Sequence, residues 1–381
     1  MAAQFDYVLV GGGLQSALIA LALHAEGSSA SVALVEKSAR LGGNHTWCFH
    51  AGDISSAASA WIAPLICNRW PGYRVRFHGR ERCIERGYAA ITSERLDRVI
   101  HDVLSAKEGG RLFQSAAAKS IGPNRVELED GTSLEGKVVI DARGPGSGSN
   151  GRAGYQKFVG LELDLAQPHR VDLPILMDAT VEQTDGFRFL YTLPLSPQRL
   201  LVEDTYFSND PELEREALRA GILDHVAANG LQVKRIVREE EGLLPMPWAG
   251  EFQLPHTGPL VAGYRGGFFH PGTGYSLPVA ARLAEVVASC APEELFGKAL
   301  WDFARAHERQ ASFCRFLNSM LFRWYPPHER WHVFKRFYGL SVETIERFYA
   351  LRLRPIDRGR LLMGRPPRGF SPRYRLARGV Q

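Results

Sequence analysis

The residues with the most specific chemistry lie near the start of the chain, between Phe5 and Glu36 in FDYVLVGGGLQSALIALALHAEGSSASVALVE. Gly11 permits a tight turn, and Gly13 lets the backbone approach a pyrophosphate closely. Leu14 opens a helix whose free N–H groups and positive dipole end attract phosphate. Glu36 ends the second strand, where its carboxylate can accept from both hydroxyls of a ribose. The spacing predicts a dinucleotide site, and the acidic residue and the early start favour FAD.

The elements around these glycines follow from the order of apolar and turn-forming residues. An apolar run at 5–10 predicts a strand, Ala and Leu at 14–24 favour a helix, and 31–35 predicts a second strand. Ser16 occupies the place of a third glycine, and its small side chain still allows helix and strand to pack closely. A buried strand–helix–strand unit of another α/β protein is the alternative, but it would not require the turn, the spacing and the terminal acid together.

Three later segments have the composition needed to return to the same cofactor. A Gly-Gly turn follows the second strand, an apolar strand at 138–141 ends in a glycine-rich run, and a strand at 260–262 leads through glycines to a helix near Ser276. That helix aims a second N-terminus at the site. The residues expected at the cofactor from these segments are Gly43, Asp141, Gly144, Gly272, Gly274 and Tyr275.

Beyond residue 153 the pattern changes to strands and indicates a mainly antiparallel domain. Strands are predicted at 158–163, 174–178, 187–193, 199–206 and 233–241, with an amphipathic helix at 210–228. Acidic residues fall in two segments of these strands, Asp178 in MDATV and the pair Glu203 and Asp204 in LLVEDT. Because side chains alternate along a strand, Glu203 and Asp204 are expected to face opposite sides of the sheet.

The predicted fold class is α/β, with a Rossmann-like FAD-binding domain, an inserted antiparallel substrate domain and a helical C-terminal region. The FAD-binding domain takes 1–60, 88–150 and 255–296, and its helix after 92 is capped by Thr92 or Ser93. The substrate domain takes 61–87 and 151–254, with a boundary at the Gly- and Ser-rich run near 148–151. Residues 297–381 form the helical, aromatic and basic region.

Composition narrows the class of protein further. The chain has 381 residues, of which 45% are hydrophobic and 23% charged, as in an ordinary globular protein with two domains. Its five cysteines are odd in number and lack CxxC spacing, so neither a disulfide framework nor a metal site is expected. A reducing cytosol is the expected compartment, and no apolar run reaches transmembrane length.

The C-terminal segment is strongly basic. From residue 352 onward it has nine arginines and a single acid, Asp357, which gives it a net charge of +8, while the whole chain carries +5. The preceding helical segment is rich in Trp, Phe and Tyr. A basic tail beside aromatic helices suggests an anionic membrane surface or nucleic acid, and a solvated terminus is the alternative.

These motifs resemble the bacterial lycopene β-cyclases of carotenoid synthesis nearly from end to end. The shared stretches include LVGGGLQSALIAL, GGNHTWCFH, GFRFLYTLPLSPQRLLVEDT and GYRGGFFHPGTGYSLP. The resemblance implies a flavoprotein fold like p-hydroxybenzoate hydroxylase and geranylgeranyl reductase, bound FAD, and NAD(P)H as reductant. It places Gly263 at the cofactor, although Tyr264 stands where related oxygenases have an acid.

The same resemblance implies an activity and its partners. The substrate would be lycopene or another acyclic carotenoid end, and the product β-carotene. The enzyme would attach peripherally to the cytoplasmic side of a membrane, with other carotenoid-pathway enzymes as possible partners. Nucleic acid is then not expected as a partner.

Cyclisation of a polyene end needs an acid and consumes no electrons. A proton is delivered to a terminal C=C, a neighbouring double bond attacks the cation, and the ring then loses a proton. The acidic motif at 201–205 implies that Glu203 and Asp204 carry this chemistry, with Glu203 as the acid, because apolar neighbours and a second carboxyl both raise a carboxyl pKa. Reduced FAD would stabilise the cation, and Asp178 is the next candidate for the acid.

Two other functions are compatible with the sequence. An FAD-dependent monooxygenase or prenyl reductase acting on an isoprenoid would share the fold, but it would change the mass of its substrate. A flavin- or carotenoid-binding carrier would bind without turnover.

Overall fold

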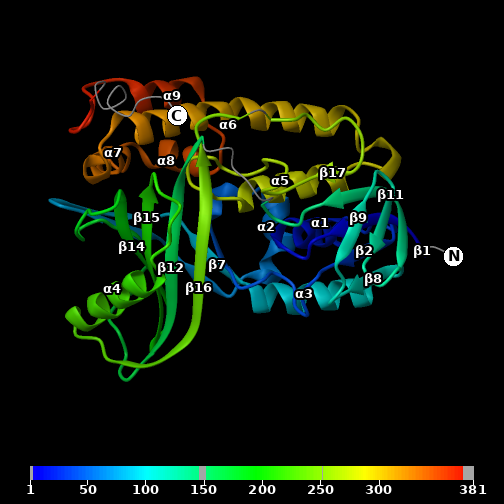
Figure 1. The fold of residues 1–381 in the computed structure, drawn as a ribbon, viewed down its shortest axis with the longest axis horizontal. Coiled ribbons are helices and arrows are strands. Elements are labelled where there is room, and N and C mark those ends of the chain that lie inside the picture. Colours follow the sequence, from blue (N-terminus) through cyan, green and yellow to red (C-terminus); the bar gives the residue numbers. More distant parts are fainter. Residues whose placement is uncertain (1–2, 146–151, 251, 372–381) are drawn as a thin grey trace.

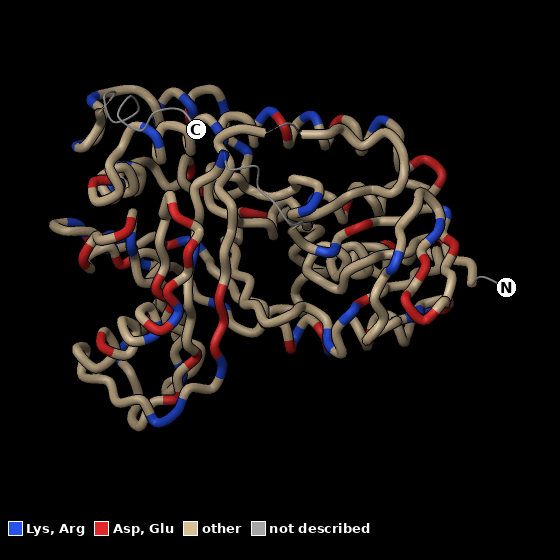
Figure 2. Tube along the Cα trace, viewed as in Figure 1, with Lys and Arg blue, Asp and Glu red and all other residues tan. Residues whose placement is uncertain are grey.

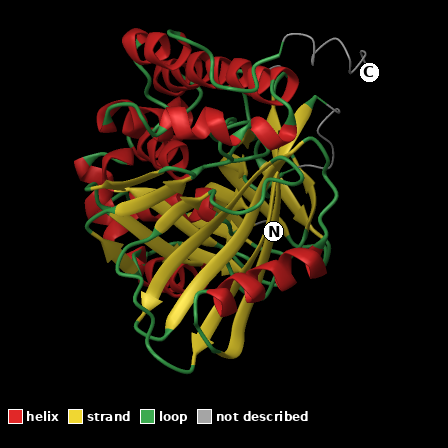
Figure 3. Cartoon of the chain, turned by 90° about the vertical axis from the view of Figure 1, so that its left-hand side faces the viewer, coloured by secondary structure: helices red, strands yellow, loops and turns green. Residues whose placement is uncertain are grey.

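The computed structural model describes residues 3–145, 152–250 and 252–371. Figure 1 shows two halves that each contain a sheet, with the C-terminal helices across the top of both. Turned by 90° in Figure 3, the long strands of the second half slant beneath this helical layer. The predicted domain boundary at 148–151 lies outside the described residues.

The first half is built on a sheet whose central strands are parallel. Its order is β8 (Gly110–Phe113), β2 (Val32–Val35), β1 (Ala3–Val10), β11 (Ser133–Asp141), β10 (Arg125–Leu128) and β9 (Ala118–Ile121), and β17 (Leu260–Val261) pairs with β11. Strands β8, β2, β1, β11 and β17 are parallel, whereas β10 runs antiparallel to both β11 and β9. Parallel strands end at one edge of a sheet, which brings Val10, Val35 and Asp141 to the same edge.

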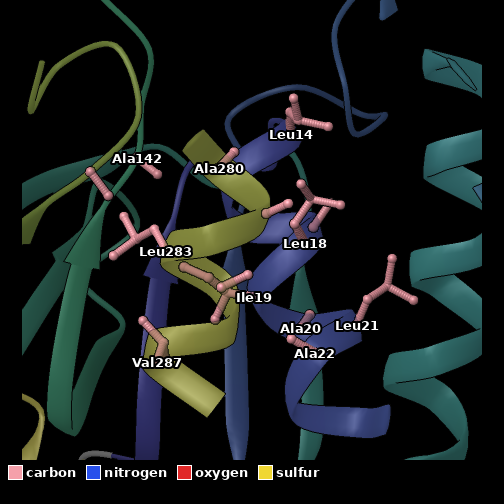
Figure 4. Packing of buried hydrophobic residues seen from close by; sticks show 14 of the residues in the cluster. Leu14, Leu18, Ile19, Ala20, Leu21, Ala22, Ala142, Ala280, Leu283 and Val287 are labelled. Atoms are coloured by element: carbon pink, nitrogen blue, oxygen red, sulfur yellow. The ribbon is translucent and has the colours of Figure 1, made fainter. Parts of the chain in front are cut away.

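Three helices cover one face of this sheet, α1 (Leu14–Ala25), α3 (Ser93–Ala106) and α5 (Leu277–Ala288). Helix α1 is apolar on all sides and is buried along almost its whole length. Figure 4 shows α1 and α5 packed side by side with Leu14 and Ala280 at the same end. The Gln15 amide donates to the Ala280 carbonyl at 3.1 Å, so both helices begin at one edge. Thr92 caps α3, as predicted.

A small antiparallel sheet connects the two halves. It has the order β3 (Thr46–His50), β7 (Tyr88–Thr92) and β4 (Asn68–Trp70), and α2 (Ser56–Ile62) follows β3 in the chain. The predicted substrate segment 61–87 is therefore divided. Its strand β4 pairs with β7, while β5 (Tyr73–Phe77) and β6 (Arg80–Ile84) enter the large second sheet.

The second half is a seven-stranded sheet, mainly antiparallel as predicted. Its order is β16 (Val233–Pro247), β12 (Ala153–Leu165), β15 (Arg199–Ser208), β14 (Phe187–Ser196), β13 (Ile175–Asp178), β5 and β6. Only the pairing of β13 with β5 is parallel among the described strands of this sheet. Helix α4 (Arg215–Ala228) packs on the outer face, and the opposite face meets the small sheet and the C-terminal helices.

The C-terminal region consists of α6 (Lys298–Trp324), α7 (Trp331–Phe337), α8 (Val342–Tyr349) and α9 (Pro355–Leu362). Short 3-10 helices occur at Ala51–Asp53, Ala63–Leu65, Pro292–Glu294 and Pro327–Glu329. Several aromatic residues of this region, such as Phe322, Tyr338 and Tyr349, are buried in the core beside the large sheet. Among the described helices, none combines the length and the apolar composition that crossing a membrane requires.

Candidate active site

The glycine turn after β1 has the geometry of a dinucleotide-binding loop. Gly11 has φ +99°, and a Cβ atom there would lie 2.7 Å from the Ala142 carbonyl oxygen, so only glycine fits. The Gly12 N–H donates to the Glu36 carboxylate at 2.7 Å, which holds the acid beside the turn. A Cβ on Gly13 would meet no described atom within 4 Å. The turn therefore leaves open space beside the backbone of Gly13, where a ligand could approach closely.

Buried polar atoms next to this turn also fit a polar ligand. Gln15 and Ser16 are 5% and 0% exposed, yet Gln15 Oε1 and Ser16 Oγ have no hydrogen-bond partner among the described residues. Unpaired buried acceptors are uncommon in folded proteins and need an explanation. A bound dinucleotide at the shared edge of α1 and α5 would provide one.

The structure brings the other predicted cofactor segments toward this edge. Asp141 ends β11 beside Val10 and is paired with Arg143 at 2.9 Å, and Gly144 follows with φ +82° and an open side. Gly263 lies after β17 with φ +59°, and a Cβ there would be 3.6 Å from Gln15 Cβ. These contacts support a common site, and the individual roles stay predictions.

The loop before α5 lies against both halves of the molecule. The Gly272 N–H donates to His270 Nδ1 at 3.1 Å, the Tyr264 hydroxyl donates to the Gly274 carbonyl, and the Tyr275 hydroxyl donates to Asp53 at 2.5 Å. Burial lowers the pKa of His270 to about 4. Tyr264, which stands where related oxygenases have an acid, thus holds this loop through a hydrogen bond to its backbone. Gly43, at φ +63°, precedes the strand β3 that reaches the second half.

A row of side chains crosses the inner face of the large sheet. Glu203 on β15 lies opposite Tyr191 on β14 and opposite Gly160 on β12, and Gly160 lies opposite Glu240 on β16. Residues directly opposite in adjacent strands share one face of a sheet. The two glutamates therefore face the same side, separated by a residue without a side chain.

Gly160 is what allows the two carboxyl-bearing side chains to approach. A Cβ on Gly160 would lie 2.8 Å from Glu203 Cγ and 3.1 Å from Glu240 Cγ, closer than side chains tolerate. A side-chain hydrogen bond connects Glu203 and Glu240. Burial raises the pKa of Glu203 well above its usual range, and the charge and hydrogen bond of Glu240 raise it further, while Arg238 opposes the shift. These contacts favour the neutral acid form of Glu203 over its carboxylate.

Glu240 is the more enclosed member of the pair, at 4% exposed. Arg238 donates to it at 3.0 Å and the Thr46 hydroxyl at 3.4 Å. Burial raises the pKa of Glu240 as well, but Arg238 opposes this shift most strongly. A cation at hydrogen-bonding distance makes Glu240 the member that holds the negative charge.

Aromatic and sulfur-containing side chains from the small sheet lie over this row. The hydroxyls of Tyr88 and Tyr191 are 3.1 Å apart, and the half-buried Cys48 has its thiol near Glu203 and hydrogen-bonded to both tyrosines. Burial raises the pKa of Cys48 to about 12, so the thiol stays neutral. The ring of Trp70 lies tilted against that of Tyr88, with 6.2 Å between the ring centroids. The acid thus faces an aromatic wall of the kind that accommodates a polyene and stabilises a cation.

Asp204 does not join this site, which corrects its prediction as a catalytic residue. It is fully buried on the opposite face, where it forms two hydrogen bonds with Arg188 at 3.0 and 2.7 Å beneath α4. The predicted alternation is confirmed, because Leu201 belongs to the inner core and Val202 to the core under α4. Asp178 is also kept apart, since it pairs with Arg76 at 3.5 Å and with Thr180.

The sequence did not single out Glu240, Arg238 or Gly160. Arg238 begins the charged run REEE, whose outer members Glu239 and Glu241 do form exposed ion pairs with α4. Strand alternation could have placed Glu240 on the inner face, but only the pairing of β12 with both β15 and β16 puts it next to Glu203. No group of three His, Cys, Asp or Glu suited to a metal ion occurs among residues 3–145, 152–250 and 252–371.

Comparison with solved structures identifies the fold. The fold matches that of a geranylgeranyl bacteriochlorophyll reductase-like protein from Thermoplasma acidophilum, with a TM-score of 0.62 and 14% identity over 93% of each chain. It also matches a probable FAD-dependent monooxygenase from Pseudomonas aeruginosa, with a TM-score of 0.55 and 16% identity over 82% of this chain and 98% of the other. The fold is thus shared with these two proteins, and the predicted fold class is confirmed.

Sequence comparison then gives the family. Residues 6–374 match the family described as lycopene cyclase protein. A lycopene beta-cyclase from Pseudescherichia vulneris is 43% identical over 379 residues, which cover 98% of this chain and 97% of the relative. The chain belongs to the lycopene cyclase family, and the predicted resemblance is confirmed.

Proposed function

We propose that this protein is a lycopene β-cyclase, which converts the acyclic ends of lycopene into β-ionone rings, forming first γ-carotene and then β-carotene. Membership in the family supports this activity. The observation that carries it in the structure is Glu203, a carboxyl kept neutral beside a second carboxyl and facing an aromatic wall.

The reaction follows from the position of Glu203. Its O–H transfers a proton to the terminal C=C, the neighbouring double bond closes the ring onto the cation, and a ring carbon gives up a proton to restore a C=C. The substrate and product therefore have the same atoms, and the protein gains no electrons. A neutral carboxylic acid in an apolar wall is suited to this step, because its proton is not lost to water at neutral pH.

The same residues stabilise the cation after the proton has left. Glu203 becomes a carboxylate next to the charge that it created. Tyr191, directly opposite Glu203, and Tyr88, whose hydroxyl meets that of Tyr191, bring aromatic rings that can stabilise the cation. The neutral Cys48 thiol adds no competing charge to this wall.

We propose FAD as the cofactor, held by the open turn at Gly13, by Glu36 at the ribose and by the joined starts of α1 and α5. Bound FAD in its reduced, anionic form would supply negative charge near the cation, and NAD(P)H would serve as the reductant. The helix starts would favour that negative charge through their N–H groups and dipoles.

We propose peripheral attachment to the cytoplasmic side of a membrane through α9 and the residues around it. Ile356, Leu362 and Met363 are 62%, 42% and 73% exposed, which is high for large apolar side chains. Figure 2 shows several blue Lys and Arg segments over the helices at this end. The single acid of the segment, Asp357, is buried in a pair with Arg347, so it offsets little of the outer positive charge. Apolar side chains among arginines suit an anionic lipid surface.

The experiment that tests the function uses purified protein with lycopene in liposomes, FAD and NADPH under anaerobic conditions. The expected product is β-carotene with the mass of lycopene. An oxygenated or saturated product would instead support a monooxygenase or prenyl reductase, and binding without any product would support a carrier.

A further inference from the structure

Glu203 has a second glutamate, Glu240, as its neighbour, and a proton donor does not by itself require one. A single buried glutamate in an apolar wall would already be a neutral acid. Here a second glutamate is brought to it across a gap in the strand between them, and that second glutamate has its own cation. Burying two carboxyls and a guanidinium costs free energy unless the arrangement serves a purpose.

We propose that Glu240 is a positioning residue that keeps the proton on Glu203 and orients it, with Arg238 holding Glu240 as the charged member of the pair. This inference deepens the proposed function, because it rests on Glu203 being the acid. Glu240 accepts the hydrogen bond of the Glu203 carboxyl between turnovers and makes loss of the proton to water unfavourable.

The contacts of Arg238 explain why the charge stays on Glu240. Arg238 lies two residues before Glu240 on the same strand and donates to it at 3.0 Å. Its other nitrogens donate to Glu162 at 3.1 Å and to the Thr46 hydroxyl at 2.6 Å. The guanidinium is thus fixed at one end of the pair, next to Glu240. When a cation lies next to only one carboxyl of a pair, that carboxyl loses its proton at the lower pH and the other keeps its proton to a higher pH.

Gly160 makes the contact possible. Any side chain on this residue of β12 would occupy the space between the two glutamates, as the distances of 2.8 and 3.1 Å to their Cγ atoms show. Glycine in the interior of a strand weakens the strand, so it commonly marks a close approach of other groups. In this sheet the approaching groups are the two carboxyl-bearing side chains.

The other titratable groups around the pair do not supply the negative charge that keeps the proton on Glu203. Cys48 and Tyr191 face Glu203 and remain neutral, because burial raises the pKa of both groups. Glu162 lies beside Arg238 but is also paired with Arg199 at 3.2 Å. Glu240 is therefore the negative group that acts on Glu203 directly.

The test is the pH profile of cyclisation. Activity requires protonated Glu203, so it falls as the pH rises through the pKa of Glu203 in the folded protein. Glu240→Gln removes the negative neighbour, and the falling limb should move to lower pH by about one unit or more. Glu240→Asp keeps the charge but withdraws it by one methylene, and its limb should lie between those of Glu240→Gln and the wild type.

Control variants distinguish this role of Glu240 from a nonspecific effect of removing a charge and from loss of folding. Glu241→Gln removes a charge one residue away on the outer face, where Glu241 pairs with Arg215, and it should leave the pH profile unchanged. Flavin occupancy reports folding of each variant, and Arg238 in Glu240→Gln retains Glu162 as a partner. If Glu240→Gln does not fold, Glu240→Asp decides the question by the position of its limb.

A falling limb that stays in place in the folded Glu240 variants would overturn the proposal, and so would an equal shift in Glu241→Gln. Glu203→Gln distinguishes this failure from failure of the proposed function. If Glu203→Gln retains turnover, the acid itself is misassigned, whereas an inactive Glu203→Gln with an unshifted Glu240→Gln refutes only the role of Glu240.

Discussion

The position of Asp204 leads to a prediction that separates stability from chemistry. Asp204→Asn removes the charge from a pair in which the carboxylate is fully buried and the Arg188 side chain is 18% exposed. Breaking a buried pair by removing one partner costs about 3–5 kcal/mol of unfolding free energy. Asparagine still accepts one hydrogen bond. Burial raises the pKa of Asp204 despite Arg188, so the attraction of Arg188 only partly offsets the cost of burying the Asp204 charge. We therefore expect a loss of about 2–3 kcal/mol.

The assay compares stability and turnover in the same preparation. Urea unfolding of the flavin-loaded protein measures the loss, and Glu241→Gln, which removes only an exposed pair with Arg215, should change little. β-Carotene formation is measured at a temperature where each variant is folded, and Asp204→Asn should remain close to the wild type. Wild-type stability with collapsed turnover would refute the reasoning, because it would place Asp204 in the chemistry.

Three further predictions follow from the site and the surface. Because the pKa of Glu203 is raised in the folded protein, the folded state keeps a proton that the unfolded chain loses near pH 4.5. The free energy of unfolding should therefore fall as the pH rises from 4.5 to the folded pKa of Glu203, by up to about 1.4 kcal/mol per pH unit. Urea titrations should show this slope in the wild type and lose it in Glu203→Gln. Gly13→Val and Glu36→Ala should each lower bound flavin, read from the absorbance of the purified protein, and full occupancy in both would contradict the assigned site. Replacing Ile356 and Met363 by serine should weaken cosedimentation with anionic vesicles, and unchanged binding at low and high salt would place the membrane contact elsewhere.

Much of the fold was accessible from the sequence because its signals are local. The glycine turn, the capped helix after Thr92 and the alternation on β15 each depend on residues close together in the chain, and each is confirmed. The division of segment 61–87 was not predicted, because whether β4 pairs with β7 or with the large sheet depends on tertiary contacts. The aromatic C-terminal helices were ambiguous for the same reason, and many of their rings are core residues.

In the candidate site as well, residues with local sequence signals were predicted, and residues that depend on strand pairing were not. Glu203 could be chosen from its apolar neighbours and its motif, and the opposite orientation of Asp204 follows from alternation. The partnership with Glu240 requires two strand registers that meet at Gly160, and both pairings join segments that are far apart in the chain. Register is set by the packing of whole strands, so the charged run around Glu240 gave no local indication of a buried carboxyl.

The central claim is that Glu203 supplies the proton that starts cyclisation, and Glu203→Gln tests it most directly. Glutamine keeps the shape of the side chain but has no transferable acidic proton, so FAD should remain bound while β-carotene formation collapses. The measurement is product formed per bound flavin, in liposomes under anaerobic conditions, for the wild type and the variant. Near-normal cyclisation by flavin-loaded Glu203→Gln would contradict the account and assign the acid to another residue.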